Sequence, residues 1–562
     1  MTTGKPRMMV AQMWMERRRL LRAVLTICAV AGLGAIVASA QEYLFSVNKG
    51  IELFGRVYRE ITVNYVDDLD PQKFMEAGID GMLKSLDPYT VYITKEDGDE
   101  VDLLTNGSYG GIGVTIGLRD GAVQVITVMD GYSAQRQGII AGDRIIQVDS
   151  VRVEAKSVNE IRGLTRGSPG TEVRVVIERE GESRPLEFVL VREEIRVKNV
   201  TFAGLLEPGI GYIRLERFSR LAGEEVRQAL RDIKLQGPVT GLVLDLRGNP
   251  GGLLEAAVDV VGKFVPRGSL VVSTKGRRQE AERTYRSDEE PLLPAGALVV
   301  LTDRGSASAS EIVAGSLQDM DRAVIVGERT FGKGLVQTIL PLDYDAQLKI
   351  TTARYYIPSG RSIQEIDYMH RDREGVFLVT PDSLKKEFRT SRGRKVFEHG
   401  GIAPDSTVAD ADDGPMVRDL YRKSLFFRFV NGYVARHPAD TTGRVTDAMM
   451  AEFKAFLEAQ KFDFQEDSEQ RIKELRANAE ASHYGTEVLE DLDRLAGAFA
   501  AEKTRAFERY REEIAGALGV ELAARLKGEK GRIVASLPSD RQFQVALGIV
   551  KNPAVYARIM SR

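Results

Sequence analysis

The sequence contains very little cysteine, histidine and tryptophan. Its 562 residues include one cysteine, four histidines and one tryptophan. The single cysteine, Cys28, excludes an intramolecular disulfide and a cysteine-based zinc site. The formal net charge of −3 gives no electrostatic reason to expect nucleic acid as a partner. No cluster of metal ligands and no cofactor motif is visible, so we expect neither a metal nor a cofactor.

The rest of the composition is typical of a soluble globular protein. Hydrophobic residues make up 43% of the chain and charged residues 28%. A chain of 562 residues is too long for one hydrophobic core, so three or four domains are expected.

The first 40 residues have the pattern of an export signal. A basic cluster, Arg17 to Arg19 and Arg22, precedes an uncharged and mostly apolar run from Ala23 to Ala40, which ends in Ala-Ser-Ala. About 18 such residues are also long enough to remain as a membrane anchor. We therefore expect an extracytoplasmic (periplasmic) protein, either released by cleavage or tethered to the inner membrane. The sequence leaves both alternatives open.

Four regions follow, and each has its own hydrophobic pattern. Helical spacing predicts an N-terminal helical region over 41–105, and short strands with glycine punctuation predict a β-rich domain over 106–195. Alternating strands and helices over 196–413 indicate an α/β core. Residues 414–562 have a charged, helical pattern, and the spacing from Val488 to Ile514 predicts one long amphipathic helix.

One serine lies where a predicted strand gives way to a helix. The strand Ala297 to Thr302 leads through a turn into a helix from about Ser308 to Met320. Free N–H groups and the positive dipole end of a helix stabilise an oxyanion beside such a serine. Ser308 and Glu311 also fit a capping box, so a purely structural role is the alternative.

A serine nucleophile needs a base, and the four histidines are poor candidates. His437 and His483 lie in the charged helical tail, and His370 and His399 flank a polar insertion. A lysine can replace histidine when burial in an apolar site lowers its pKa. Lys333 lies between two glycines inside an apolar stretch and is the candidate base, although most lysines are simply solvated.

A glycine-rich turn, Arg247 to Gly252, follows the apolar strand Gly241 to Leu246. Its small residues allow close backbone approach, and its N–H groups can point at a substrate carbonyl. The turn lacks the spacing of a phosphate-binding loop. Taken alone, it could equally be a structural turn.

Four sequence blocks, in order, resemble the carboxyl-terminal processing proteases, also called tail-specific proteases. These blocks are Asp245–Gly252, Gly305–Ile312, Val326–Gln337 and Thr351–Arg361. The resemblance runs from about Val47 to Asp405 and is to bacterial, PDZ-containing serine peptidases. It implies an α/β fold: a crotonase-like protease core with an inserted β-rich PDZ domain, N-terminal helices and a C-terminal helical extension.

The resemblance also implies roles for individual side chains of the core. Ser308 is the nucleophile, Lys333 is the general base, and Gln337 orients the lysine. The competing serines are Ser306 and Ser310. The separation of 25 residues between Ser308 and Lys333 matches the family and favours the middle serine.

Backbone groups are implied at two further places. The N–H groups of Ala309 and of Gly251 or Gly252 form the oxyanion hole. The loop that binds a peptide carboxylate in the PDZ domain consists of Gly110, Gly111, Ile112, Gly113 and Val114.

The expected function is a serine endopeptidase that captures protein substrates by their C-terminal tails and cleaves them outside the cytoplasm. One alternative is a non-catalytic PDZ scaffold, against which the intact Ser308, Lys333 and Gln337 argue. Another is a crotonase-type acyl-CoA enzyme, against which the export signal argues. The substrates, and whether an adaptor protein takes part, stay open.

The tail helix must bury its apolar stripe somewhere. We therefore expect a homodimer in which the terminal helical regions make the subunit contacts. An intramolecular helical cap is the alternative.

Overall fold

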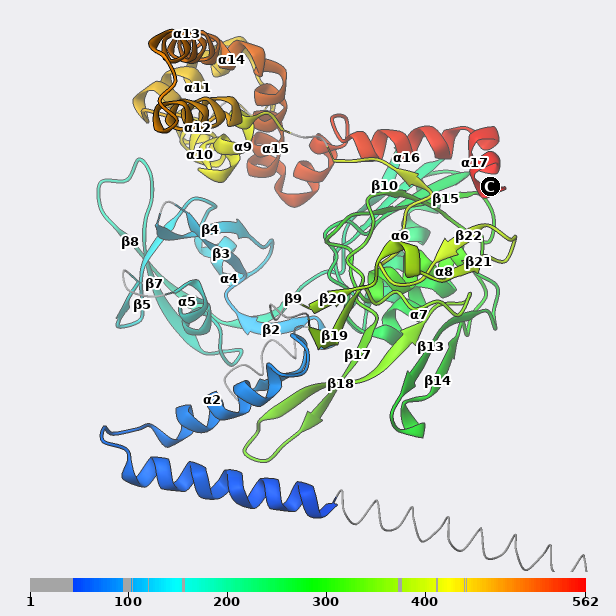
Figure 1. Ribbon diagram of the computed structural model, residues 1–562. Coiled ribbons are helices and arrows are strands. Elements are labelled where there is room, and N and C mark those ends of the chain that lie inside the picture. The colour runs from blue at the N-terminus through cyan, green and yellow to red at the C-terminus, as the bar shows by residue number, and fades with distance from the viewer. Residues whose placement is uncertain are drawn as a thin grey trace, which may run out of the picture. The chain divides into compact units, whose positions relative to one another are not determined.

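The computed structural model describes residues 44–94, 103, 105–119, 121–153, 157–371, 377–410, 413–438, 440 and 442–561 (Figure 1). The predicted signal peptide or anchor, residues 1–40, lies outside the described residues. Within the described ranges, no helix is both long and apolar enough to cross a membrane. The chain divides into two compact units, Met1–Pro88 and Tyr89–Arg562.

The first unit contains two helices, in the region where helical spacing predicts them. Residues 44–64 form one helix, and α2 spans Pro71–Leu83. The carboxylate of Asp70 caps α2 by accepting N–H groups of its first turn. The first helix exposes large apolar side chains, of which Leu44, Val47, Ile51 and Phe54 form a row along one face; Phe45, Leu53 and Val57 are exposed as well.

The β-rich domain is an antiparallel sheet in the order β3-β4-β5-β7-β8, with β3 at its edge. The strands are β3 (Val114–Arg119), β4 (Ala122–Val128), β5 (Arg144–Val148), β6 (Val151–Arg152), β7 (Glu172–Glu178) and β8 (Leu186–Val191). Two helices accompany them, α4 (Ser133–Gln137) and α5 (Val158–Thr165), and Ser157 caps α5 in a capping box with Glu160. A separate pair, β2 (Ser108–Gly111) and β9 (Glu193–Arg196), joins the two ends of the domain.

The α/β core is built on a six-stranded sheet in the order β10-β11-β12-β15-β16-β23. The strands are β10 (Val200–Glu207), β11 (Ile210–Leu215), β12 (Gly241–Asp245), β15 (Ala297–Thr302), β16 (Val324–Gly327) and β23 (Ser406–Thr407). All pairs from β11 to β23 are parallel. The helices α6 (Ala222–Gln236), α7 (Leu254–Gly262) and α8 (Ala309–Asp319) contribute side chains to the main hydrophobic core.

A second sheet contains β1 (Val91–Ile93), β13 (Leu270–Gly276), β14 (Arg283–Arg286), β17 (Leu335–Pro341) and β18 (Gln347–Tyr356). Smaller elements complete the core: β19 (Ile366–Arg371) with β20 (Phe377–Val379), β21 (Glu387–Arg389) with β22 (Lys395–Phe397), and the 3-10 turns Gln279–Ala281 and Asp382–Leu384. The parallel strands β12 and β15 both lead into turns at the same edge of the sheet, where the site is built.

The last two helices of the chain return to this core. α16 (Arg541–Lys551) packs on β12, β15 and β16 and is followed by α17 (Pro553–Met560), which also contacts β16 (Figure 1). Phe543 and Val550 are buried in one cluster with Tyr212, Val243 and Val299 of the sheet. The sequence pattern of residues 414–562 does not distinguish these helices from those before them.

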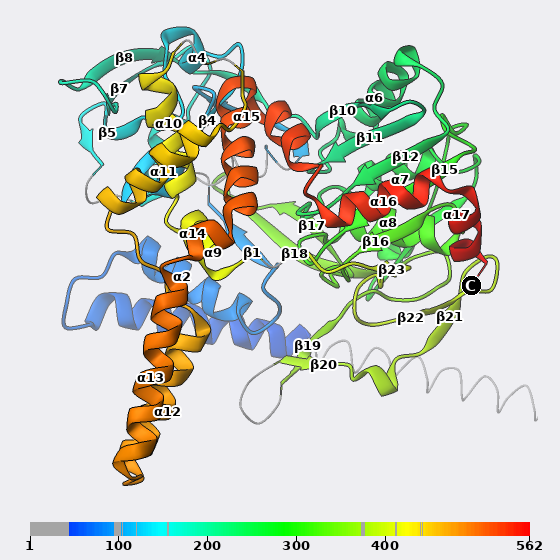
Figure 2. The same ribbon diagram turned by 90° about the horizontal axis from the view of Figure 1, so that it is seen from above.

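The helices before α16 have a hydrophobic cluster of their own. The cluster is formed by α9 (Pro415–Arg422), α10 (Leu425–Arg436), α11 (Asp447–Ala459), α14 (Ala506–Arg509) and the first part of α15 (Arg511–Ser536), whereas α12 (Asp467–Ala481) and α13 (Thr486–Lys503) contribute none of its residues. The prediction of one long helix through Val488 and Ile514 is wrong, because three helices share that range. Phe507 and Ile514 turn inward to the cluster, whereas Val488 and Leu495 stay exposed on the α12–α13 hairpin (Figure 2). One straight helix cannot place its first half on an exposed hairpin and its second half in the buried cluster.

Candidate active site

Ser308 lies directly before α8, at the N-cap position. Its backbone φ of +55° is in the left-handed region, which a serine adopts only when the surrounding structure holds it there. The residue is half-buried, in contrast to the fully buried residues that follow it on α8. The predicted turn-to-helix position of Ser308 is therefore confirmed, and the turn is strained.

The two competing serines use their hydroxyls to hold the glycine-rich turn after β12. Both Ser306 and Ser310 are fully buried. The Ser306 hydroxyl donates to the Leu246 carbonyl at 2.8 Å, and the Ser310 hydroxyl donates to the Asn249 carbonyl at 2.9 Å. The hydroxyls of Ser306 and Ser310 are therefore used in hydrogen bonds that hold the turn, which distinguishes these two serines from Ser308.

The glycine-rich turn lies directly against the serine turn. The Asn249 carbonyl accepts the Ala307 N–H at 3.0 Å. Gly251 has a φ of +99°, and a Cβ added there would lie 2.6 Å from the Ala307 carbonyl oxygen and 2.8 Å from the Ala309 nitrogen. A side chain at this position would push the two turns apart, so glycine is required.

The three candidate N–H groups for the oxyanion hole, those of Ala309 and of Gly251 or Gly252, differ in their hydrogen bonds. The Gly251 N–H donates to Asn249 Oδ1 at 2.9 Å. Those of Ala309 and Gly252 donate no hydrogen bond to any residue that the structure describes. Ala309 and Gly252 thus offer the two N–H groups that a substrate oxygen could accept.

Glu311 connects the serine turn to the lysine loop. Its carboxylate, which is fully buried, accepts the Ser308 N–H at 2.8 Å and the Lys333 N–H at 2.8 Å. It also accepts the Gly332 N–H at 2.7 Å and the Thr330 hydroxyl at 2.6 Å. Burial raises the pKa of Glu311 to about 7, although these hydrogen bonds favour the carboxylate.

Tyr355 makes a second connection between the same two segments. Its hydroxyl, carried on β18, is within hydrogen-bonding distance of the carbonyl oxygens of Ser308, at 3.1 Å, and of Lys333. Burial, and to a lesser extent Glu311, raise the pKa of Tyr355, so it stays protonated as a donor. Sequence reasoning gave Glu311 only a capping role and Tyr355 none. The available signal was an acid inside the apolar stretch of α8.

Lys333 is half-buried on the loop before β17. Its Nζ lies 4.1 Å from the centre of the Tyr89 ring. Gln337 lies on β17 and donates from Nε2 to Thr351 Oγ1 at 3.2 Å, across the β17–β18 pair. Its role in orienting the lysine stays a prediction.

Among the described residues, no group of three or more histidine, cysteine, aspartate or glutamate side chains is arranged to hold a metal ion.

The β-rich domain has a groove of about 380 Å³ beside its edge strand β3. Of the five residues predicted to bind a peptide carboxylate, Gly111, Ile112 and Val114 line the groove, whereas Gly110 and Gly113 do not. Its other lining residues are Leu103, Tyr109, Thr115, Ile116, Met129, Arg162, Thr165, Arg166, Val197 and Arg217. An edge strand beside three arginines suits a peptide that adds as a strand and ends in a carboxylate.

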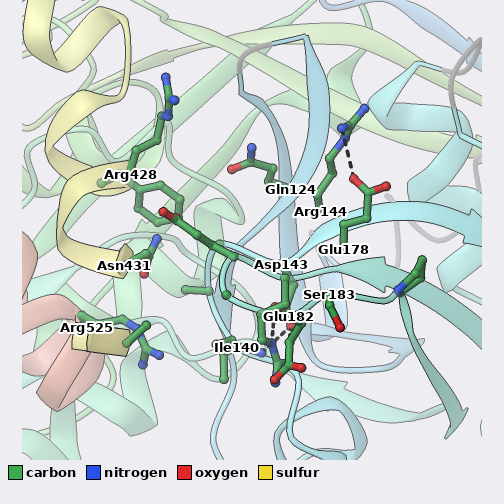
Figure 3. A pocket seen from close by; sticks show the side chains of 18 of the residues that line it. Gln124, Ile140, Asp143, Arg144, Glu178, Glu182, Ser183, Arg428, Asn431 and Arg525 are labelled. Atoms are coloured by element: carbon green, nitrogen blue, oxygen red, sulfur yellow. Dashed lines mark hydrogen bonds and ion pairs between the residues drawn. The ribbon is translucent and has the colours of Figure 1, made fainter. Parts of the chain in front are cut away.

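A larger hollow, of about 570 Å³, lies between this domain and helices α10 and α15 (Figure 3). Charged residues line it, and several pair with one another: Arg179 with Asp143 at 2.8 Å, and Arg144 with Glu178 at 3.2 Å. None of the predicted catalytic residues lines this hollow. It is therefore separate from the candidate active site.

The fold and the site define a class of protein, a serine-type peptidase with a PDZ domain. The chain matches the family model "Peptidase family S41" over residues 209–372 and "PDZ domain" over 124–179. Residues 416–550 match "Probable PDZ-protease, C-terminal helical domain", and 31–97 match "Activating protease CtpB N-terminal domain".

The curated relatives identify the family within this class. A carboxy-terminal-processing protease of Bartonella bacilliformis is 40% identical over 321 residues, which cover 57% of this chain and 73% of the relative. Carboxy-terminal processing protease CtpB of Bacillus subtilis is 27% identical, with 74% of this chain and 88% of the relative covered. The chain therefore belongs to the carboxy-terminal processing proteases of peptidase family S41, and the predicted fold class is confirmed.

A solved structure titled photosystem II D1 C-terminal processing protease is 30% identical to this chain. The match covers 62% of this chain and 85% of that one, with a TM-score of 0.35. The family assignment does not depend on it.

Proposed function

We propose that this chain is a serine endopeptidase that uses Ser308 as nucleophile and Lys333 as general base. The proposal is carried by the different hydrogen bonding of the three neighbouring serines. The hydroxyls of Ser306 and Ser310 hold the glycine-rich turn, while Ser308 is the half-buried serine at the strained helix start. Glu311 and Tyr355 hold the Ser308 and Lys333 segments together.

In the proposed first step, Ser308 Oγ attacks the scissile carbonyl carbon while its proton passes to the neutral amine of Lys333. The C=O π pair moves to the carbonyl oxygen, which becomes an oxyanion. The N–H groups of Ala309 and Gly252 face this oxygen and stabilise its charge. Ala309 is the first residue of α8, so the helix dipole adds to the effect.

The tetrahedral intermediate collapses when the peptide C–N bond breaks. The ammonium of Lys333 gives its proton to the leaving amine, which leaves an acyl ester on Ser308. Water then attacks the ester carbonyl with Lys333 again as base. The bond from the acyl carbon to Ser308 Oγ breaks, the Lys333 ammonium returns its proton to Ser308 Oγ, and the acid product departs. Lys333 must be neutral at the start of both halves of the reaction.

Substrate capture is proposed to occur at the groove beside β3. A C-terminal tail would add as a strand to the sheet edge, with its carboxylate near Ile112 and Arg166. The predicted N-terminal signal supports action in the periplasm, with the chain either cleaved free or held at the inner membrane. The exposed apolar row on the 44–64 helix supports a homodimer.

The catalytic proposal is tested with matched variants and a purified protein substrate that carries an apolar C-terminal tail. Ser308→Ala and Lys333→Met should each lower the cleavage rate by at least about 10³-fold while the unfolding temperature is kept. Ser316→Ala is the serine control, since it removes the hydroxyl of a buried serine within α8, which donates to the Val271 carbonyl. Lys349→Met on β18 is the matched lysine control.

Near wild-type cleavage by the Ser308→Ala variant would reject Ser308 as nucleophile. Losses in the two controls as large as in the two test variants would show a general packing effect instead.

The location is tested by fusing residues 1–40 to a reporter enzyme that is active only outside the cytoplasm. Activity of the fusion is expected. An inactive fusion that accumulates inside the cell would reject export.

A further inference from the structure

Arg247 begins the glycine-rich turn and is held on one side by the end of β12. Its Nε and Nη2 donate to the Asp245 carboxylate, at 3.0 and 2.7 Å, and its backbone N–H does so at 3.0 Å. Asp245 is fully buried and also accepts the Tyr212 hydroxyl at 2.7 Å. Burial alone would raise the pKa of Asp245, but Arg247, Arg214 and Tyr212 hold it below its ordinary value.

The other side of Arg247 is held by the helix α16, almost 300 residues later in the chain. Asp540 accepts Nη1 at 3.0 Å and Nη2 at 2.6 Å, and Gln542 Oε1 accepts Nη1 at 3.1 Å. Together with Asp245, these residues accept all five N–H donors of the guanidinium. The orientation of Arg247 is therefore fully determined, and α16 determines half of it.

The position of Arg247 affects the position of the oxyanion donor in the glycine-rich turn, because the two are linked through a few bonded residues. Gly248 and Asn249 follow it in the chain, and the Gly248 N–H donates to Asp303 at 2.9 Å. The Asn249 side chain accepts the Gly251 N–H, while its carbonyl accepts from the serine turn. A shift of Arg247 would move this short, tightly bonded turn and with it the Gly252 N–H.

The ionic contact is not needed to dock α16. Phe543, Leu547 and Val550 of α16 are buried against the sheet, and Lys551 at its far end pairs with Glu207 at 2.5 Å. A partly buried ion pair adds little net stability compared with apolar packing. Attachment of α16 to the sheet therefore does not account for the ion pair between Asp540 and Arg247.

We infer that Asp540 and Gln542 are positioning residues of the active site, so that the start of α16 contributes to catalysis as well as to folding. They act through Arg247 to hold the glycine-rich turn where Gly252 can bind the oxyanion. The inference deepens the proposed function and rests on it, because it assumes that the turn supplies an oxyanion donor.

The test compares Asp540→Asn with Lys551→Met in the full chain. Asparagine keeps the N-cap of α16 but loses the charge and one acceptor oxygen for Arg247. We expect kcat to fall about 10- to 100-fold, with KM changed less than about threefold. A peptide aldehyde, whose hemiacetal with Ser308 places an oxyanion in the hole, should bind more weakly by a similar factor. Lys551→Met should change neither constant.

A double-mutant cycle tests the route through Arg247. The variant with Asp540→Asn and Arg247→Gln should be no slower than Arg247→Gln alone, since the two residues act in series. Fully additive losses would overturn the inference.

An Asp540→Asn variant with wild-type kcat and wild-type aldehyde binding would also overturn the inference, even if its unfolding temperature dropped. If that variant does not fold, Gln542→Met removes one acceptor of Arg247, together with the donor to the Val408 carbonyl. It should lower kcat and aldehyde binding together, and no change in either would reject the inference. The proposed function is judged separately by Ser308→Ala, so the two can fail independently.

Discussion

Replacing Glu311 by glutamine tests whether its carboxylate aligns the nucleophile with the base. The substitution keeps the size of the side chain and one acceptor oxygen. It replaces the other oxygen with an NH₂ donor, which then faces N–H groups of the Ser308 and Lys333 segments or the hydroxyl of Thr330. Of the four hydrogen bonds that the carboxylate accepts, two lose their acceptor.

The expected stability change at pH 8 is small because two large effects oppose each other. Two buried donors without acceptors cost roughly 2–6 kcal/mol in the free energy of unfolding, at about 1–3 kcal/mol each. Glutamine also removes the cost of burying a charge. The rise of the Glu311 pKa from 4.5 to about 7 corresponds to about 3 kcal/mol at a pH above both values. The net effect should lie between a stabilisation of about 1 kcal/mol and a destabilisation of about 3 kcal/mol.

The effect on catalysis should be much larger, because a misplacement of about 1 Å costs on the order of 10² in rate. We expect kcat to fall about 100-fold. Ser308 and Lys333 would keep their side chains but lose the shared acceptor that sets their separation.

The pH dependence has opposite signs for stability and for activity. Below pH 4.5, Glu311 is protonated in both the folded and the unfolded chain, and its contribution to stability is fully present. Between pH 4.5 and about 7 the folded chain binds more protons, so stability falls as pH rises, by up to about 3 kcal/mol. Activity should rise through the same window, since only the carboxylate accepts all four hydrogen bonds.

The assay is urea unfolding at pH 5 and pH 8 in a Ser308→Ala background, together with kcat of the active enzymes over the same range. Relative to the wild type, Glu311→Gln should lose the fall in stability and the rise in kcat near pH 7. Glu255→Gln, at an exposed position on α7, is the matched control and should keep both. A Glu311→Gln enzyme with wild-type kcat would refute the aligning role.

Further predictions concern the oxyanion turn, the base, the substrate tail and assembly. Gly251→Ala should lower kcat at least about 10-fold, because the new Cβ would lie 2.8 Å from the Ala309 nitrogen; wild-type kcat would contradict the close approach. Activity that depends on neutral Lys333 should persist into alkaline pH, so a maximum below pH 6 would exclude a lysine base. Amidating a substrate's C-terminus should slow its cleavage markedly, and equal rates would reject selection by the PDZ domain. Light scattering should give twice the mass of one chain, and Ile51→Glu on the exposed apolar row should yield monomers; a monomeric wild type would end the dimer hypothesis.

The local sequence alone determined most of the elements and the family. Short-range patterns predict the strand before Ser308, the helix after it and the tight turn at Gly251, because hydrophobic spacing, capping residues and glycine act within a few residues. Motif order then identified Ser308 and Lys333 as the candidate pair. These features need no knowledge of which distant segments meet.

Only the tertiary structure decided how distant segments share one site. It assigned the hydroxyls of Ser306 and Ser310 to the glycine-rich turn, and the carboxylate of Glu311 to the lysine loop. It also placed Asp540 against Arg247 at the edge of the core sheet, although the sequence pattern grouped the segment of Asp540 with the charged tail. Hydrogen bonds of this kind depend on where folding places two chain segments. Hydrophobic spacing records which side of a helix is buried, but not what it is buried against.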